Sequence, residues 1–288
     1  MMMPDGEALT IIAGGGAIPS YVAAAAAKAG RPVFVIGIKG EADQAIAAFP
    51  HEFLDWGQLG RLDEILRSRH GRDLVLVGSI RSRPDFKGIS LDLATMRSLK
   101  DILAIIIGGD DDVLTGAIRF FERRGMRIVG AHEVATDLVV TAGPLGRVQP
   151  GRAERRDMET ALRAARAIGA IDAGQAAVAV NGRVVALEAA EGTDAMLARV
   201  GALKTARRVK WEGRAGVLGK CAKPQQDLRV DMPTIGPQTV EAAVGLGLAG
   251  IAVEAGRVMI VDRAEAIRRA DAAGLFVVGE ESTVGAPW

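Results

Sequence analysis

The sequence predicts an α/β protein with two domains: an N-terminal domain built on a Rossmann-like parallel sheet, and a C-terminal α/β domain that contains hairpins. The chain has 288 residues, and at roughly 150 residues per domain this length corresponds to about two domains. The first half alternates short apolar runs with amphipathic stretches, which is typical of a parallel sheet covered by helices. The second half contains hairpin signals instead. We therefore expect the domains to cover residues 1–145 and 146–288.

The N-terminal half is predicted to begin with a strand, a glycine turn and a helix. Residues 9–13 are apolar, residues 14–16 are Gly-Gly-Gly, and the helical stretch 19–29 ends at Gly30. The further strands share an apolar composition and are expected at residues 32–38, 73–80 and 126–130. The further helices share amphipathic spacing and are expected at residues 59–69 and 113–124, with Asp111 or Asp112 as the cap of the second. Residues 104–108 fit either a strand or the end of a buried helix.

The C-terminal half is predicted to follow a linker at residues 141–151, which contain three Gly and two Pro. A charged helix is expected at residues 152–170. The strongest hairpin signal is Asn181-Gly182, which lies between apolar runs at 176–180 and 183–188. The remaining elements are a second hairpin, two helices and a final strand, expected at residues 251–262 (turning at 255–257), 236–248, 263–273 and 275–279.

The composition excludes several classes of protein. One Cys cannot form an internal disulfide or a Cys-rich metal site, and it fits a reducing cytoplasm. The three His are far apart in the sequence, and none has a ligand spacing such as H-E-x-x-H. Eleven aromatic residues and a net charge of +1 argue against a nucleic acid partner. Chemistry in this chain must therefore come mainly from carboxylates, Lys, Arg and backbone N–H groups.

Membrane insertion is not expected, because every apolar run is interrupted well before ~18 residues. No targeting segment is expected at the N-terminus either. The basic stretch 204–214 carries one aromatic anchor, Trp211. It fits contact with an anionic membrane surface, and it fits a solvated loop equally well. The expected location is cytoplasmic, with peripheral membrane contact left open.

The first candidate site is the glycine turn. Gly14, Gly15 and Gly16, followed by Ile18 and Pro19, lie between a strand and a helix, where backbone N–H groups can approach a phosphate. The dinucleotide fingerprint G-x-G-x-x-G fails because Pro19 occupies its last position, and no acidic residue closes the second strand. A phosphate or ribose contact and a simple tight turn both remain open.

The second candidate site is the densest group of charges. Lys220, Lys223 and Arg229 lie beside Asp227 and Asp231. If residues 227–231 were extended, their charged side chains would share one face, and the two carboxylates could hold Mg²⁺. The cations could neutralise phosphate oxygens during phosphoryl transfer. The alternative is an edge strand whose charges are simply solvated.

The third candidate site covers residues 188–196. Glu188 ends a predicted strand, Glu191 and Asp194 lie near the start of the next helix, and Thr193 or Asp194 can cap it. Capping alone explains these residues in isolation. Together with the carboxylates of the second candidate site, they are the best candidates in the chain for metal ligands or acid–base catalysts.

Weaker candidates complete the set. Gly236 and Thr239 open a helix whose N-terminus could bind an anion, and Arg81 follows a strand at the end where α/β folds usually bind ligands. The Asp run 110–112 is explained by the start of a helix. Cys221 is interpreted as a packing residue, although Lys220 beside it could lower its pKa.

Motifs along the whole chain resemble those of one family. They are A-G-G-G-x-I-P, G-D-D, E-x-x-E-G-T-D-A-M, K-x-x-K-P-x-Q-D-x-R-x-D-x-P-T-I-G and G-I-A-V-E-A-G, at residues 13–19, 109–111, 188–196, 220–236 and 250–256. In these motifs the sequence resembles the bacterial UDP-2,3-diacylglucosamine pyrophosphatases of lipid A biosynthesis, the type unrelated to calcineurin-like phosphoesterases.

The resemblance implies two α/β domains with the substrate held between them. It implies Mg²⁺-dependent hydrolysis of UDP-2,3-diacylglucosamine to UMP and 2,3-diacylglucosamine 1-phosphate (lipid X), by attack of water on the sugar-side phosphorus. The implied partners are the acylated UDP-sugar and the lipid product. A homodimer and contact with the inner membrane stay open. An NAD-dependent oxidoreductase and a non-catalytic nucleotide-sugar sensor are the alternative functions.

The resemblance also assigns roles to residues. Asp227 becomes the best single catalytic residue or metal ligand, with Asp231, Glu188, Glu191 and Asp194 as metal-ligand candidates around it. The diphosphate would be held by three cations, Lys220, Lys223 and Arg229. The substrate-binding candidates are Gly14, Gly15, Gly16, Ile18, Pro19, Arg81, Thr193, Gln226, Gly236 and Thr239.

Overall fold

The computed structural model describes residues 7–69, 71–80, 92–96 and 110–281, without the side chains of 110–112. The chain forms two compact units. The first comprises Met1–Thr136 together with Arg229–Asp231, and the second comprises Asp137–Leu228 and Met232–Trp288. The mixed α/β class is confirmed. The expected domain boundary at residue 145 stays a prediction, although the units themselves separate at Thr136.

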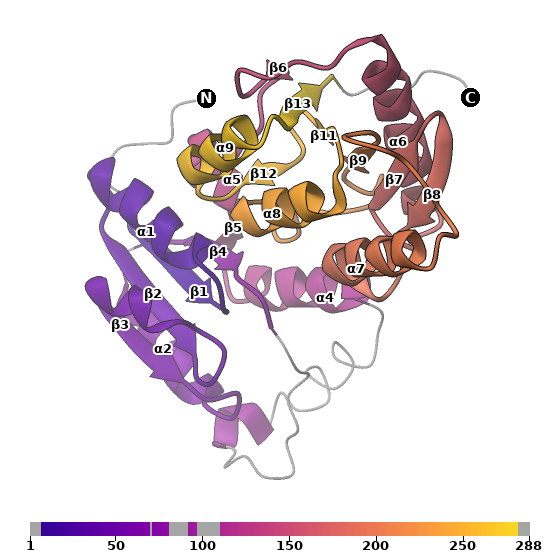
Figure 1. Ribbon diagram of the computed structural model, residues 1–288. Helices are drawn as coiled ribbons and strands as arrows, with labels where there is room; N and C mark the ends of the chain where they lie inside the picture. Colours follow the sequence, from indigo (N-terminus) through magenta and orange to yellow (C-terminus); the bar gives the residue numbers. More distant parts are fainter. Residues whose placement is uncertain (1–6, 70, 81–91, 97–109, 282–288) are drawn as a thin grey trace. The chain divides into compact units, whose positions relative to one another are not determined.

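The first unit is built on a parallel sheet of five strands in the order β3-β2-β1-β4-β5 (Figure 1). The strands are β1 (Leu9–Ala13), β2 (Val33–Ile38), β3 (His51–Leu54), β4 (Asp73–Val77) and β5 (Arg127–Ile128). The apolar composition of the three central strands, β1, β2 and β4, follows from burial on both faces, as expected for a parallel sheet. The chain order reverses between β1 and β4, and this is where doubly wound folds bind ligands.

Helices cover both faces of this sheet. The helices are α1 (Ile18–Lys28), η1 (Gln44–Ala48), α2 (Leu59–Ser68), α4 (Asp110–Glu122) and α5 (Ala131–Val134). α1 contacts β1, α5 contacts β4, and the two helices contact each other. The core on the other face includes Leu62 and Leu66 of α2, Phe120 of α4 and Leu74 of β4. The amphipathic spacing at residues 59–69 and 113–124 therefore predicted α2 and α4 correctly. The expected cap is wrong, because α4 begins at Asp110, so that Asp111 and Asp112 already belong to the helix.

The second unit contains a six-stranded sheet in the order β6-β13-β11-β9-β7-β8. The strands are β6 (Gly143–Pro144), β7 (Ala176–Val180), β8 (Arg183–Leu187), β9 (Val217–Lys220), β11 (Gly250–Glu254) and β13 (Phe276–Glu280). β9, β11 and β13 are parallel, whereas β7 and β6 run antiparallel to their neighbours. A separate parallel pair joins β10 (Thr234–Ile235) to β12 (Met259–Ile260).

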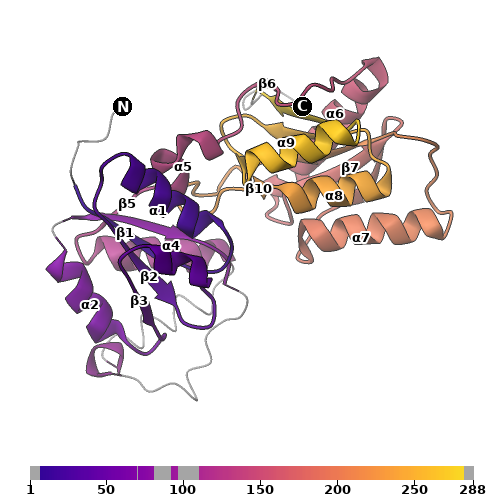
Figure 2. The same cartoon turned by 60° about the vertical axis from the view of Figure 1, so that its left-hand side comes forward.

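Helices of the second unit also cover both faces of its sheet. α6 (Arg152–Ala170) packs on one face, where Met158 and Leu162 contact Val217 and Phe276. The other face is covered by α7 (Gly192–Thr205), α8 (Pro237–Leu246) and α9 (Arg263–Ala272), which lie side by side (Figure 2). The sequence predicted the bounds of α6 correctly.

The Asn181-Gly182 hairpin is confirmed. β7 and β8 pair antiparallel, and both turn residues have positive φ, 53° and 76°. This conformation favours Asn and Gly, so the turn is encoded locally. The carboxylate of Asp157, on α6, accepts hydrogen bonds from the Asn181 and Gly182 N–H groups at 3.0 and 2.5 Å.

Three expectations are wrong. Residues 141–151 are not only a linker, because they contain β6, which pairs with β13. β11 and β12 do not form a hairpin: β9 and β13 already occupy both edges of β11, and β12 pairs with β10. Residues 227–231 are not extended, since the chain turns at 228–230, and Val230 packs on the core of the first unit.

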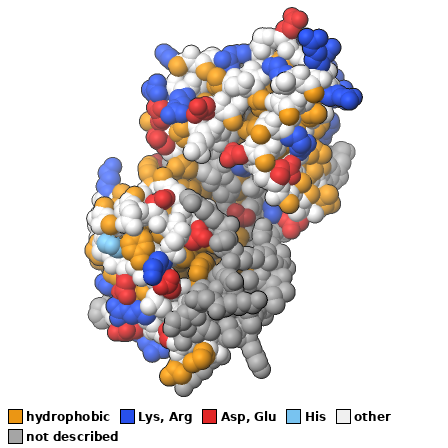
Figure 3. All heavy atoms as spheres, turned by 60° about the horizontal axis from the view of Figure 1, so that its bottom comes forward, with side chains coloured by type: hydrophobic (Ala, Val, Ile, Leu, Met, Phe, Trp, Pro, Cys, Tyr) orange, Lys and Arg blue, Asp and Glu red, His pale blue; other side chains and the backbone are white. Residues whose placement is uncertain are grey.

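Charged side chains are interspersed on the face shown in Figure 3. Basic and acidic groups alternate there, in agreement with a net charge of +1. Among the residues that the structure describes, no helix combines the length and apolarity needed to cross a membrane.

Candidate functional site

The candidate site lies at one edge of the second unit's sheet. Strands β9 and β11 are parallel, and β8 has the same direction because both β8 and β9 are antiparallel to β7. Their carboxyl ends, at Lys220, Glu254 and Leu187, therefore meet at one edge. Open α/β sheets bind ligands at such an edge. Three charged residues of the family motifs, Glu188, Lys220 and Glu254, are buried here.

Lys220 is the centre of a polar cluster on the face covered by α7 and α8. Its ammonium donates hydrogen bonds to Thr193 Oγ1 at 3.1 Å and to the Thr234 carbonyl at 3.0 Å. The Thr193 hydroxyl donates in turn to Glu188 Oε1 at 3.2 Å. Lys220 is 7% exposed and Glu188 is 6% exposed. Buried charges are tolerated where they are hydrogen-bonded and close to opposite charge, so this cluster holds a cation and a carboxylate in fixed positions.

The second carboxylate oxygen of this cluster has no hydrogen-bond partner in the part of the chain that the structure describes. Glu188 Oε2 is buried, and the described residues offer it no donor. Leaving a buried acceptor unsatisfied costs about 1–3 kcal/mol, and more for a charged group. Such an oxygen is suited to accept a cation, a water molecule or a substrate hydroxyl.

Thr193 and its neighbours differ from the expected capping pattern. The helix α7 is preceded by Glu191, and neither Thr193 nor Asp194 makes a side-chain cap, so the capping prediction is wrong. The Thr193 hydroxyl instead forms hydrogen bonds with Glu188 and Lys220. The Glu191 carboxylate pairs with Arg199 at 2.7 Å, and this hydrogen bond lowers the pKa of Glu191. Asp194 is exposed in the first turn of α7.

A second polar cluster lies on the face covered by α6. Cys221 is buried there, and burial raises the pKa of its thiol to about 12. Arg166, Glu254 and Arg257 are close enough to influence this thiol electrostatically. The Nε atom of Arg166 is buried without a hydrogen-bond partner among the described residues, whereas Arg257 Nε lies 3.4 Å from Glu254 Oε2. Cys221 is thus a packing residue, and the Arg166 guanidinium offers an N–H donor for an anion.

The segment after Lys220 is held by contacts to α6 and β11. The Ala222 N–H donates to Glu254 Oε2 at 3.2 Å, and the Lys223 N–H donates to Gln226 Oε1 at 3.0 Å. The Lys223 ammonium pairs with Asp172 at 2.6 Å. Gln226 is buried and has a structural role, because its side chain accepts the hydrogen bond from the Lys223 N–H. Its contact with the substrate stays a prediction.

The acidic residues of the motif lie in a turn. Asp227 is half-buried, belongs to the second unit and follows Gln226 directly. Arg229 and Asp231 belong to the first unit, where Arg229 NH1 lies 3.5 Å from Glu122 of α4. The turn removes the shared face on which the sequence argument placed their side chains. The roles of all three residues stay predictions.

The described residues do not form a metal site from protein groups alone. Among the described residues, no three His, Cys, Asp and Glu side chains come together as metal ligands. Mg²⁺ commonly uses only one or two carboxylates and completes its shell with water and substrate phosphates. Glu188 fits such a site, because one of its buried oxygens has no partner. Glu191 fits it less well, since its carboxylate is held by Arg199.

The glycine turn of the first unit is closely packed. The Gly14 and Gly15 N–H groups donate to the carbonyls of Val77 and Ser79 at 2.9 and 2.8 Å. A Cβ on Gly14 would lie 2.5 Å from the Ser79 oxygen, so the approach of β4 requires glycine here. The Gly16 N–H donates to Asp43 Oδ2 at 2.6 Å. A phosphate at this turn would have to displace Asp43, so a hydroxyl contact suits the turn better.

The other predicted binding residues have diverse positions. Ile18 and Pro19 form the first turn of α1. The Gly236 N–H, at the start of α8, donates to Thr239 Oγ1 at 3.3 Å. Arg81 and the predicted element at 104–108 lie outside the described residues, as does Gly109 of the G-D-D motif.

Sequence reasoning missed several members of the site. Thr234, Arg166 and Arg257 were not candidates, and Glu254 was noted only as part of a motif. The sequence could have indicated only Glu254. This acidic residue ends a fully apolar strand, and the carboxyl ends of parallel strands are where α/β sheets bind ligands. The contacts of the other three depend on chain segments far apart in the sequence.

The fold and the site define an α/β protein with a buried lysine, two buried carboxylates and nearby arginines at the carboxyl edge of a sheet, an arrangement suited to hold an anionic substrate together with a cation. Family models match both parts: the LpxI N-terminal domain matches residues 8–138, and the LpxI C-terminal domain matches residues 141–278. The UDP-2,3-diacylglucosamine pyrophosphatase LpxI of Caulobacter vibrioides is 42% identical over 271 residues, which cover 94% of this chain and 96% of that protein. The chain belongs to the LpxI family.

Proposed function

We propose that this protein is a hydrolase that splits the pyrophosphate of UDP-2,3-diacylglucosamine into UMP and 2,3-diacylglucosamine 1-phosphate, with Mg²⁺ as cofactor. The observation that carries the proposal is the buried Glu188–Thr193–Lys220 cluster, in which one oxygen of Glu188 has no hydrogen-bond partner among the described residues. The relative from Caulobacter, whose name states this activity, supports the substrate and the class of reaction.

The reaction needs no covalent nucleophile from the protein. A water oxygen bonds to the sugar-side phosphorus, and the bond from this phosphorus to the bridging oxygen breaks. The bridging oxygen leaves with the uridylyl phosphorus as UMP, and the proton of the attacking water passes to a carboxylate. Asp227 is our candidate for that base, because it is a half-buried carboxylate in the motif that also contains the cations. Such a reaction depends mainly on positioning and on neutralising charge.

The cations of the site divide between two tasks. Lys220 is buried and bonded to Thr193 and Thr234, so it positions these groups and adds positive potential at the edge of the sheet. Arg166 has a buried Nε–H group without a hydrogen-bond partner among the described residues, so it is the better candidate to bind diphosphate oxygens directly. Arg257 Nε already lies 3.4 Å from Glu254 Oε2 and would exchange that carboxylate for the substrate. Lys223 would join them after exchanging Asp172 for the substrate.

Glu188 would hold Mg²⁺ together with the diphosphate and water. When bound, the cation would neutralise charge on the phosphate oxygens. This role explains why Glu188 Oε2 has no donor within the described chain.

The test is release of UMP from UDP-2,3-diacylglucosamine by the full-length protein, with and without Mg²⁺. We expect turnover that EDTA abolishes and Mg²⁺ restores, and a loss of at least about 100-fold for Asp227→Asn. Binding of the substrate without UMP release under any divalent cation would identify a sensor instead. Tight NADH binding would support an oxidoreductase, and either result would overturn the proposal.

A further inference from the structure

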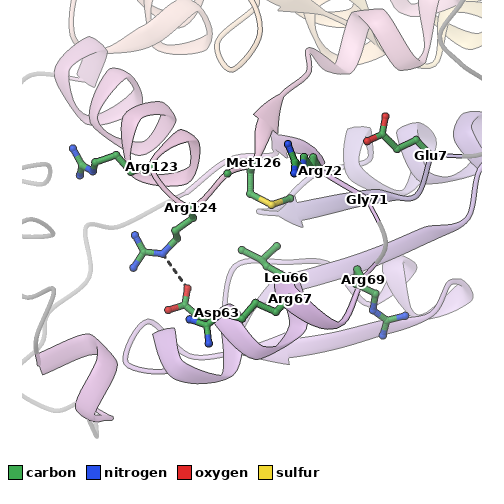
Figure 4. A pocket seen from close by; sticks show the side chains of 11 residues that line it. Glu7, Asp63, Leu66, Arg67, Arg69, Gly71, Arg72, Arg123, Arg124 and Met126 are labelled. Atoms are coloured by element: carbon green, nitrogen blue, oxygen red, sulfur yellow. Dashed lines mark hydrogen bonds and ion pairs between the residues drawn. The ribbon is translucent and has the colours of Figure 1, made fainter.

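A cavity of about 780 Å³ lies in the first unit, away from every residue discussed so far as a site. Its lining comes from the segments that precede β1, β4 and β5 and from the carboxyl-terminal ends of α2 and α4. Figure 4 shows Leu66 and Met126 in the middle of this cavity, with arginine side chains around them. We call it the arginine basin, after its residues Arg67, Arg69, Arg72, Arg123 and Arg124.

The basin has an excess of positive charge. Its lining contains five arginines and two carboxylates, Glu7 and Asp63, although the whole chain has a net charge of only +1. Both carboxylates are already paired: Asp63 with Arg124 at 2.9 Å, and Glu7 with Arg127, outside the lining, at 3.4 Å. An incoming anion would therefore meet carboxylates whose charge is largely compensated.

Several of the basin arginines have no carboxylate partner in the described part of the chain. Arg67, Arg72 and Arg123 are exposed and form no ion pair with any residue in the described part of the chain. The Arg69 guanidinium lies over the Phe34 ring, 3.8 Å from its centroid, and this cation–π contact leaves its positive charge without an ion pair to a carboxylate of the described chain. Four like charges around one hollow repel each other, and an anion would relieve that repulsion.

The ends of two helices do not account for this number of arginines. One basic residue in the last turn, Arg67 of α2 and Arg119 of α4, already balances each helix dipole. Arg69, Arg72 and Arg123 lie beyond the helices, and Arg72 comes from the segment before β4. Chain segments that are far apart in sequence thus converge on one positively charged hollow.

The basin is separate from the glycine turn of the same unit. The turn follows β1 at its carboxyl end, whereas the basin surrounds the amino ends of β1, β4 and β5. Five residues of parallel strand, about 16 Å, separate the two edges. The basin therefore cannot be another part of a ligand site at that turn.

We propose that the arginine basin binds a phosphate group. Guanidinium forks match the oxygens of phosphate with paired N–H donors, and several forks can share one phosphate or diphosphate. The volume of about 780 Å³ leaves room for a phosphate together with part of the molecule that carries it, and Leu66 and Met126 supply an apolar floor beside it. The phosphate could belong to a free anion or to a lipid headgroup, and the experiment separates these two sources.

The experiment maps arginines that a phosphate protects from modification by phenylglyoxal, with mass spectrometry of the full-length protein as the readout. Inorganic pyrophosphate tests the free source, with sodium chloride at equal ionic strength as the control. Vesicles of phosphatidylcholine, with or without phosphatidylglycerol, test the lipid source by flotation. Protection of Arg72 and Arg123 by pyrophosphate supports the free anion. Flotation that needs phosphatidylglycerol and these two arginines supports the headgroup.

Variants provide the second half of the test. Arg72→Gln/Arg123→Gln removes two exposed basin charges, and Arg152→Gln/Arg155→Gln removes two exposed charges of α6 as the matched control. For the basin variant we expect at least tenfold weaker protection of the remaining basin arginines by pyrophosphate, or at least tenfold weaker flotation with vesicles. The control variant should behave like wild type in both measurements. UMP release from detergent-dispersed substrate should be unchanged in both variants. The inference is overturned if wild type shows neither protection nor flotation, or if both variants respond alike. Failure of UMP release alone would contradict the proposed function and not the basin.

Discussion

The Lys220 ammonium donates a hydrogen bond to Thr193 Oγ1 at 3.1 Å, across 27 positions of the sequence. The contact joins the end of β9 to the first turn of α7. Because the same hydroxyl donates to Glu188, one threonine positions both a buried cation and a buried carboxylate. A valine of the same shape would leave both charges without this partner.

Thr193→Val is therefore expected to lower kcat for UMP release, whereas Thr193→Ser should keep most of it. Hydrogen bonds to charged groups contribute about 1.5–3 kcal/mol, which corresponds to a loss of about 10- to 100-fold. Steady-state kinetics of both variants measure the effect, and circular dichroism checks that they fold. A valine variant with wild-type kcat would show that the hydroxyl does not position the catalytic groups.

Glu188→Gln tests the proposed cation ligand. The amide keeps the shape and can still accept from Thr193, but it removes the charge at the unpartnered oxygen. We expect the Mg²⁺ concentration for half-maximal rate to rise about tenfold, the lower end for removing a group that supports a metal site. Glu191→Gln is the matched control, and we expect no such rise because Arg199 already holds that carboxylate. Equal shifts in the two variants would contradict the assignment.

The difference between the correct and the incorrect predictions follows from the range of the interactions. Asn181 and Gly182 themselves favour the positive φ values that their turn needs, so four or five residues encoded that hairpin. Gly256 also has a positive φ, 75°, and marks a real turn. The two strands around it nevertheless do not pair with each other. β11 pairs with β9 and β13, and β12 pairs with β10. A turn signal predicts a reversal of the chain and not the pairing of its strands.

The candidate site shows the same limit. Periodicity and the family motifs selected Glu188, Thr193 and Lys220 individually from the sequence. That Thr193 joins the other two, and that Arg166 and Arg257 approach Cys221 from α6 and from the turn after β11, depends on the packing of the whole sheet. The turn at 228–230 was missed because the burial of Val230 in the first unit depends on tertiary contacts.

Cys221 should be chemically inert in the native protein. Burial raises the pKa of its thiol to about 12, so the thiol stays protonated at pH 8. Ellman's reagent should react with this thiol only after unfolding by denaturant. Cys221→Ala should keep UMP release, at a modest cost in stability for the lost packing. Rapid labelling of the native protein would show that the face covered by α6 opens readily.

The buried carboxylate of Asp73, at the start of β4, should make the stability of the first unit depend on pH. Asp73 is 1% exposed and contacts Arg31 at 2.8 Å and Arg127 at 2.5 Å. Burial acts to raise the pKa of Asp73, but the hydrogen bonds from Arg127 and Arg31 outweigh it, and the pKa lies below its ordinary value of 3.8. The ionised carboxylate thus favours the folded state. Its contribution is present above the unfolded pKa and is lost as the pH falls through the folded pKa.

Asp73→Asn should lower the free energy of unfolding at pH 7 by about 3 kcal/mol, because it leaves the buried Arg31 without its counter-charge. Asp55→Asn is the matched control, since the Lys39–Asp55 pair is exposed at 65% and 46% and should contribute less than about 1 kcal/mol. Thermal unfolding followed from pH 7 to pH 3 measures both effects. The gap between wild type and Asp73→Asn should shrink on acidification, because wild type loses the same charge by protonation. A gap that stays constant would mean that the side chain stabilises β4 through its shape and not through its charge.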